Sequence, residues 1–213
     1  MKTLLFLRHG KTAYTGQFPD LTDEGKREIS DAADHIAEIV GNKTFVQIVS
    51  SSAPRALGSA DIINKRLGMQ SVIEEEPAIR CMDFYDSEKA KAIWASFPNA
   101  RAVDCAYATD SQFEEGTVIE KRSAIQHRFF NYLSTLFERF AANKSHDVSI
   151  YVSHYEVLWS LVKATIPTQE PLIHGELIEL NLDRPGVIVR FRGYREEFDY
   201  GVLVNLFAGR FKV

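Results

Sequence analysis

The sequence is poor in cysteine, in long apolar runs and in excess charge of one sign. Its two cysteines, Cys81 and Cys105, are too few for a disulfide framework or a cysteine-rich zinc site. No apolar stretch is long enough to span a bilayer, and the run over residues 4–7 is too short for a signal peptide. The formal net charge of −4 lacks the basic excess typical of nucleic-acid binding. We therefore expect a cytoplasmic protein without a membrane or nucleic-acid partner.

Several ligand-binding motifs are also absent. The sequence contains neither a Walker loop nor the Gly-x-Gly-x-x-Gly fingerprint of dinucleotide-binding proteins. It has no two-histidine-plus-carboxylate spacing that indicates a metal site. We therefore expect no metal and no cofactor, so an anionic ligand would need a local cluster of basic side chains.

The pattern of apolar residues predicts a single α/β domain over residues 1–213 with three layers. Short apolar runs typical of buried parallel strands alternate with apolar spacings of three and four that are typical of helices. We expect a mostly parallel central sheet, helices on both faces and an antiparallel edge near the C-terminus. The expected strands are 4–7, 45–49, 71–73, 149–153, 176–182, 187–192 and 202–206. The expected helices are 22–40, 54–67, 87–97, 118–140 and 155–166, and 99–112 is expected to be a loop.

Titratable and basic side chains follow three of these strands. Arg8 and His9 end the first strand, Arg55 lies in the first turn of the helix after the second, and His154 follows the strand 149–153. Ligands of open α/β sheets bind beyond the carboxyl ends of the strands, so these four residues are expected at one edge. Gly10 allows the chain to turn sharply or to approach a ligand closely.

Each of these residues also has a simpler structural interpretation. Arg8 and His9 could form a salt bridge in a loop, and Arg55 could pair with Asp61 or Glu75 on the surface. His154 could be a hydrogen-bonded core histidine. The recurrence of the pattern at three strand ends favours a cationic pocket suited to a phosphoryl group, whose transfer needs positioning and charge neutralisation. Neighbouring arginines should lower the pKa of His9 and keep it nucleophilic.

The sequence resembles the histidine phosphatase superfamily, in the group related to cofactor-dependent phosphoglycerate mutase. The resemblance covers residues 3 to about 165 and is specific for the superfamily but for no one member. The matching elements are Arg8-His9-Gly10 with Thr12, Leu21-Thr22 with Gly25, Ser51, Arg55-Ala56, Ser59-Ala60 and Val152-Ser153-His154.

The resemblance implies a metal-independent phosphatase that hydrolyses small phosphomonoesters through a phosphohistidine on His9. Arg8, Arg55 and His154 would hold the phosphoryl oxygens, and Thr12 and Tyr155 would add contacts to the substrate. The physiological substrate and the oligomeric state remain open.

The sequence departs from the family pattern where an acidic residue often protonates the leaving group. Cys81 occupies that position, and a thiol with a pKa of about 8.5 is a poor substitute. Asp83 is the candidate replacement because alternate residues of an extended segment share a side, and Glu115 is the reserve. Tyr155 replaces the glycine that commonly follows the second histidine, which argues for a narrowed pocket or for an aromatic contact to the substrate. Because tyrosine and not aspartate follows His154, the resemblance disfavours the histidine acid phosphatase branch.

Two alternative functions stay open. Phosphoglycerate mutases usually carry Trp-Asn where this chain has Tyr14-Thr15, which disfavours mutase-type phosphoryl transfer. A weakly active, regulatory module that binds a phosphorylated ligand is the other alternative, because Cys81 replaces the acid. Residues 13–20 and 98–116 are expected to shape the pocket.

Overall fold

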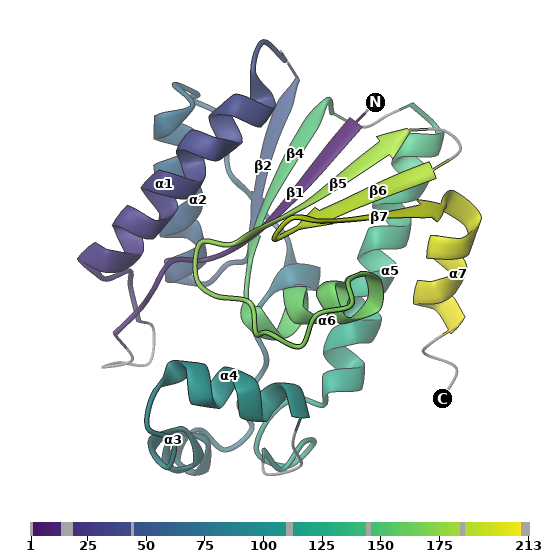
Figure 1. The fold of residues 1–213 in the computed structure, drawn as a ribbon. Coiled ribbons are helices and arrows are strands. Elements are labelled where there is room, and N and C mark those ends of the chain that lie inside the picture. The colour runs from purple at the N-terminus through teal and green to yellow at the C-terminus, as the bar shows by residue number, and fades with distance from the viewer. Residues whose placement is uncertain are drawn as a thin grey trace.

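A mixed β-sheet forms the centre of the molecule (Figure 1). The computed structural model describes residues 2–13, 19–43, 45–109, 113–143, 146–183 and 186–209. The strand order is β3-β2-β4-β1-β5-β6-β7; β3, β2, β4 and β1 run parallel, and β5, β6 and β7 add to β1 in antiparallel fashion. This confirms the predicted fold class. The strands are β1 (Lys2–Arg8), β2 (Val46–Ser50), β3 (Glu74–Glu75), β4 (Val148–Ser153), β5 (Leu177–Asp183), β6 (Gly186–Phe191) and β7 (Tyr194–Asp199).

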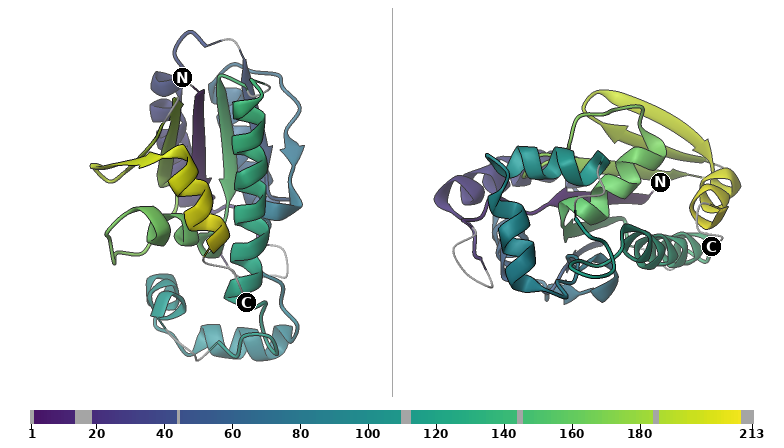
Figure 2. Two further views of the ribbon diagram at one scale, coloured as in Figure 1. Left: turned by 90° about the vertical axis from the view of Figure 1, so that its right-hand side faces the viewer. Right: turned by 90° about the horizontal axis from the view of Figure 1, so that it is seen from below.

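Helices cover both faces of this sheet, as Figure 2 shows from two further sides. The helices of the main body are α1 (Asp23–Val40), α2 (Pro54–Arg66), α5 (Arg122–Ala141), α6 (Tyr155–Thr165) and α7 (Tyr200–Gly209). The central strand β1 alternates between the two cores that result. Its Leu5 and Leu7 pack with α1 and α2, whereas Leu4 and Phe6 pack with α5 and α6. Burial on both faces explains why β1 is a continuous apolar run.

The turn after β1 is fixed by two close backbone approaches. A Cβ on Gly10 would lie 2.3 Å from the carbonyl oxygen of Gly25, and one on Gly25 would lie 2.2 Å from that of Lys11. The hydroxyl of Thr22 accepts a hydrogen bond from the Gly25 amide at 3.0 Å, which makes Thr22 the N-cap of α1. Two glycines therefore let the chain beyond β1 lie directly against the first turn of α1.

A pair of short helices lies beyond the carboxyl ends of β1, β2 and β4 (Figure 1, bottom). They are α3 (Ser87–Ala95) and α4 (Ala100–Thr109), and the 3-10 helix η1 (Pro77–Ile79) precedes them. The expected loop over 99–112 is therefore wrong for residues 100–109. Among the side chains of α4 that the structure describes, only Val103 and Tyr107, one turn apart, are deeply buried, and two buried positions are too few to show a helical period in the sequence. The N-cap of α3 is Asp86, whose carboxylate accepts from the Lys89 amide at 2.9 Å.

Three further expectations were wrong. The strand expected at 71–73 is the two-residue β3 at Glu74–Glu75, and the strand expected at 202–206 lies within α7. The unpredicted strand β7 is an edge strand of mostly exposed residues, which hides its pattern. Helix α7 buries Leu203, and its Tyr200 packs on Phe137 of α5 with ring centroids 5.4 Å apart. Helix α5 begins at Arg122 rather than at residue 118.

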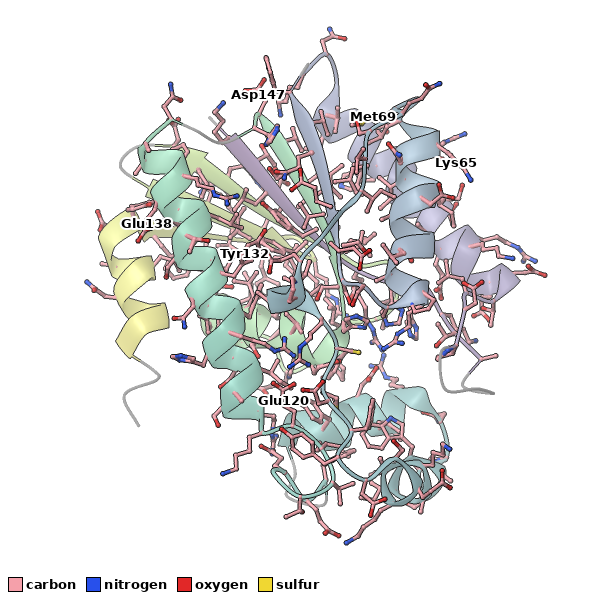
Figure 3. All side chains as sticks on the ribbon, turned by 180° about the vertical axis from the view of Figure 1, so that it is seen from behind. Lys65, Met69, Glu120, Tyr132, Glu138 and Asp147 are labelled. Carbon is pink, nitrogen blue, oxygen red and sulfur yellow. The ribbon has the colours of Figure 1, made fainter. Side chains whose placement is uncertain are left out.

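Figure 3 shows the two ends of the molecule. Glu120 lies at the end that carries α3 and α4, and Asp147 and Met69 lie at the opposite end. Among the residues that the structure describes, no helix has the length and apolar character needed to cross a bilayer.

Candidate active site

Four side chains from three strand ends meet in one place. Arg8 is the last residue of β1, Arg55 lies in the first turn of α2, and His154 is the N-cap residue of α6 directly after β4. Parallel pairing sets Arg8 opposite Ser153, and the His9 amide donates to the Ser153 carbonyl at 3.0 Å. Arg8, His9 and His154 are no more than 3% exposed. The pairing of β1 with β4 therefore brings the two histidines to the same edge.

The hydrogen bonds of His9 define its tautomer. Its Nδ1 lies 2.7 Å from the carbonyl oxygen of Gly10, an acceptor only, so Nδ1 carries the proton. Its Nε2 accepts a hydrogen bond from Nε of Arg55 at 3.1 Å. The unprotonated, nucleophilic nitrogen of His9 thus faces a guanidinium group.

His154 lies on the other side of the same guanidinium. Its Nδ1 is 3.2 Å from Nη2 of Arg55, which can only donate, so Nε2 carries the proton and donates to Oγ of Ser51 at 2.7 Å. The rings of His9 and His154 are 5.0 Å apart between centroids. Arg55 therefore contacts both histidines, and not Asp61 or Glu75 as the surface interpretation required.

Both histidines are uncharged near neutral pH. Burial lowers the pKa of His9 well below its usual value, and its electrostatic interactions with His154, Arg55 and Arg8 lower it further. Burial is also the largest cause of the lowered pKa of His154, followed by Arg55 and Arg8. The pKa of His9 is lowered, as expected from the neighbouring arginines, but burial contributes more to the shift than the arginines do.

The guanidinium of Arg8 is held by groups from three other parts of the chain. Its Nη1 donates to Oδ2 of Asp104 at 2.7 Å and to the carbonyl oxygen of Leu172 at 2.5 Å. Its central carbon lies 5.0 Å from the ring centroid of Tyr155, whose hydroxyl donates to the Asp104 carbonyl at 2.9 Å. Its buried Nε has no partner among the described residues. Arg8 is thus fixed in place through Nη1 and the ring of Tyr155, and its Nε stays available to a ligand.

A pocket opens between this cluster and α3 and α4. Its polar lining contains two carboxylates, Asp104 of α4 and Glu156 of α6, together with the thiol of Cys81. Burial raises the pKa of Asp104, although Arg8 opposes the shift. Burial and then Glu156 raise the pKa of the Cys81 thiol. One oxygen of Glu156 accepts from the Met82 amide at 2.9 Å.

The structure does not bring the two predicted acids to this pocket. Asp83 is exposed, and its carboxylate binds Nη1 of Arg80 at 2.6 Å. Glu115 accepts from the Arg122 amide at 2.9 Å and also binds the Arg122 guanidinium. The consecutive residues Cys81 and Met82 both line the pocket and Asp83 does not, so the alternation expected of an extended segment does not hold here.

The two predicted substrate contacts differ in their placement. Tyr155 lines the pocket beside Arg8. Thr12 is buried, forms an isolated β-bridge with Leu21 and lies outside the lining; its hydroxyl has no partner among the described residues. Tyr14 and Thr15 lie outside the residues that the structure describes, as do parts of both segments expected to shape the pocket.

Sequence reasoning missed three titratable groups near the cluster: Asp104, Glu156 and His174. The ring of His174 lies 5.7 Å from that of His9, and its buried Nε2 has no partner in the described part of the chain. Burial, followed by the charge of Arg8, lowers the pKa of His174 to about 3. Its one sequence signal is Gly175, which follows at positive φ and marks a turn before β5.

The family model of the histidine phosphatase superfamily (branch 1) matches residues 4–185. The chain belongs to this superfamily. The match spans both histidines and both arginines of the cluster and extends beyond the segment on which the resemblance depended. No curated protein matches significantly.

Solved structures of other histidine phosphatase-like proteins share the fold. A mycobacterial glucosyl-3-phosphoglycerate phosphatase complexed with VO3 is 20% identical, with 92% of this chain and 100% of that chain covered and a TM-score of 0.60. A putative alpha-ribazole-5'-P phosphatase from Escherichia coli is 16% identical, with 92% and 97% covered and a TM-score of 0.62. Such identities support a common fold and do not identify a substrate for this member of the superfamily.

Proposed function

We propose that this protein is a metal-independent phosphatase that hydrolyses phosphomonoesters through a phosphohistidine on His9. One observation supports this most strongly: the unprotonated Nε2 of His9 lies 3.1 Å from Arg55, among buried groups that suit a phosphoryl anion. Membership of the superfamily and the names of its structural neighbours also favour phosphatase activity. In the described residues, no cluster of three or more His, Cys, Asp or Glu side chains forms a metal-binding arrangement.

In the proposed first step, Nε2 of His9 attacks phosphorus in line with the ester oxygen. The N–P bond forms as the P–O bond to the leaving alcohol breaks. Arg55 and His154 contact the phosphoryl oxygens, and Arg8 binds one of them after it exchanges Asp104 for the substrate. Water then attacks the phosphohistidine and releases phosphate, which restores the neutral imidazole. Charge neutralisation by fixed donors supplies much of the catalysis.

We assign the protonation of the leaving group to Asp104, in place of Asp83. The phosphoryl dianion competes with Asp104 for Arg8, and a nearby negative charge raises a carboxyl pKa beyond what burial alone does. The displaced carboxyl group therefore takes up a proton as the substrate binds. It can give that proton to the ester oxygen as the P–O bond breaks, and later accept one from the attacking water.

The decisive experiment measures hydrolysis of p-nitrophenyl phosphate with and without EDTA, for the wild type and for His9→Ala. We expect chelator-independent activity that His9→Ala abolishes. His35→Ala is the matched control because His35 is exposed on α1, and it should retain full activity. Activity that persists in His9→Ala would exclude His9 as the nucleophile.

One observation favours the alternative of a regulatory module that binds a phosphorylated ligand. Cys81 stands where relatives often carry the acid, and Asp104 already occupies Arg8. In that case phosphate would raise the melting temperature while no phosphomonoester was turned over. Exchange of phosphate between positions of phosphoglycerate, dependent on a bisphosphate primer, would instead indicate a mutase.

A further inference from the structure

We propose that the substrate of this phosphatase is an aryl-type phosphomonoester, whose leaving group is flat and apolar and carries no second negative charge. The inference rests on the proposed function and concerns the half of the pocket that faces away from the two histidines. Three observations support it independently: an aromatic wall, the balance of charge in the lining, and a buried hydroxyl without a partner among the described residues.

The wall beyond the phosphate-binding cluster is aromatic. Phe84, Trp94, Tyr107 and Tyr155 line the pocket together with Met82. The rings of Phe84 and Trp94 pack edge to face with centroids 5.7 Å apart, and those of Tyr107 and Tyr155 lie 6.3 Å apart. Such edge-to-face networks accept a further ring in the same geometry.

This wall is rigid at its base and open at its rim. Phe113, fully buried behind it, packs on Trp94 at 5.2 Å and on Tyr107 at 5.5 Å, which ties α3 to α4. Phe84 lines the pocket and is nevertheless 46% exposed. A leaving group that stacks on Phe84 would remove this apolar surface from water, which a small hydrophilic leaving group cannot do.

The charges of the lining disfavour a leaving group that carries a negative charge of its own. Arg8 and Arg55 are the only described lysine or arginine side chains that line the pocket, and the phosphoryl group uses both. Asp104 and Glu156 contribute negative charge beside them. Two further cations border the lining without belonging to it: Arg101 is exposed on α4 and influences the pKa of Asp104, and Arg122 lies 5.4 Å from the ring centroid of Tyr107 but is paired with Glu115. A carboxylate or second phosphate on the leaving group would therefore meet repulsion without compensation.

Tyr107 supplies a polar group within the aromatic wall. It is 4% exposed, and its hydroxyl has no hydrogen-bond partner among the described residues. Burial raises its pKa, so the hydroxyl keeps its proton and can donate. Buried hydroxyls are usually satisfied, which makes an acceptor atom on the leaving group the natural partner. An aryl group that carries an ether, amide or ring nitrogen acceptor fits this requirement.

The first test compares two substrates that differ in charge and little else: 4-carbamoylphenyl phosphate and 4-carboxyphenyl phosphate. We expect kcat/KM to be on the order of tenfold or more higher for the amide, because an uncompensated like charge in a partly buried site is strongly unfavourable. Glu156→Gln retains an oxygen that can accept from the Met82 amide, and it should reduce the preference. Equal or better hydrolysis of the carboxylate, or of 3-phosphoglycerate, would overturn the inference.

The second test uses adjacent aromatic residues. Phe84→Ala should raise KM for 2-naphthyl phosphate about tenfold through lost apolar contact, with little change for methyl phosphate. Tyr85→Ala is the matched control, because Tyr85 is 58% exposed and does not line the pocket. Equal effects of the two variants, or equal effects on both substrates, would contradict an aromatic binding site.

The third test is Tyr107→Phe, which keeps the ring and removes the hydroxyl. It should lower kcat/KM for 4-carbamoylphenyl phosphate and leave phenyl phosphate unchanged; the same change for both substrates would refute the role of the hydroxyl. Failure of the inference is distinguishable from failure of the proposed function. If p-nitrophenyl phosphate is hydrolysed through His9 but none of these preferences appears, the substrate class is wrong and the phosphatase assignment stands.

Discussion

The replacement of Asp104 by asparagine separates two effects that the wild-type carboxyl group combines. The asparagine side chain is nearly isosteric, but it can neither neutralise Arg8 nor donate a carboxylic proton. The Arg8–Asp104 pair is well shielded, with side chains 4% and 16% exposed. At an effective dielectric of about 20, unit charges about 4 Å apart attract by about 4 kcal/mol. The substrate phosphate must offset that attraction, so Asp104→Asn should leave KM unchanged or lower it.

The turnover number should change in the opposite direction, and by an amount that depends on the leaving group. Loss of a general acid reduces the rate roughly 10²–10⁴-fold when the leaving group is poor. p-Nitrophenolate departs without a proton, so kcat for p-nitrophenyl phosphate should fall less than about tenfold. We therefore expect kcat of Asp104→Asn to fall far more for phenyl phosphate than for p-nitrophenyl phosphate.

The assay is a series of substituted phenyl phosphates, with kcat and KM measured for each and log kcat plotted against the acidity of the leaving phenol. The slope should be shallow in the wild type and steep in Asp104→Asn. Asp83→Asn and Glu115→Gln are the controls, because these two carboxylates face Arg80 and Arg122 instead of the pocket. A steep slope in Asp83→Asn with a shallow one in Asp104→Asn would refute the assignment and restore the acid expected from the sequence.

Three further predictions concern stability. The pKa of His174 is about 3 in the folded protein, so below its unfolded value of about 6.5 the unfolded state binds more protons and stability falls as pH falls. Urea unfolding of His174→Gln between about pH 6.5 and 4.5 should show a slope shallower by up to about 1.4 kcal/mol per pH unit, and an unchanged slope would contradict the lowered pKa. Gly25→Ala would place a Cβ 2.2 Å from a backbone carbonyl oxygen, so we expect a loss of about 1–3 kcal/mol, whereas Gly58→Ala, with 3.4 Å to its nearest atom, should not lower the melting temperature. Arg128→Met removes a 3.2 Å partner from the 6% exposed carboxylate of Glu120, which keeps only Arg80 at 3.4 Å as a charged partner, and should cost about 3 kcal/mol in urea unfolding. The double variant with Glu120→Met should recover part of this loss; no recovery would show that the hydrogen bonds from Arg128 to the carbonyls of Ala78, Arg80 and Cys81, and not the charge of Glu120, account for it.

The meeting of the two arginines and two histidines could be predicted because its signals are local in sequence. Arg8 and His9 follow a buried strand directly, Arg55 follows Pro54 in a first helical turn, and His154 follows another buried strand. Parallel pairing then places all of them at one edge without further information. The same locality explains why the helices with a long apolar face were predicted within a few residues, whereas the edge strand β7 and the helix α7 were not.

The part of the pocket formed by Asp104 and the aromatic side chains of α3 and α4 could not be predicted, because it depends on contacts between segments that are distant in sequence. Asp104 reaches the pocket only because Val103 and Tyr107 anchor α4, and because the Tyr155 hydroxyl binds its backbone carbonyl 51 residues away. Asp83 was the better candidate by spacing alone, yet Arg80, three residues before it, binds its carboxylate in the folded chain.

Different parts of the chain line the two halves of the pocket. The motifs shared with the superfamily form the cluster to which we assign the phosphoryl group, and they do not include the residues that would contact the alcohol. In this chain the alcohol would lie against α3 and α4, where Trp94, Tyr107 and Asp104 belong to none of the motifs on which the resemblance depended. Exchange of side chains on these two helices should therefore change the preferred leaving group, while the phosphohistidine chemistry proposed for His9 should persist. Loss of phosphohistidine formation from p-nitrophenyl phosphate in a correctly folded Trp94→Ala variant would show that the two halves are not separable.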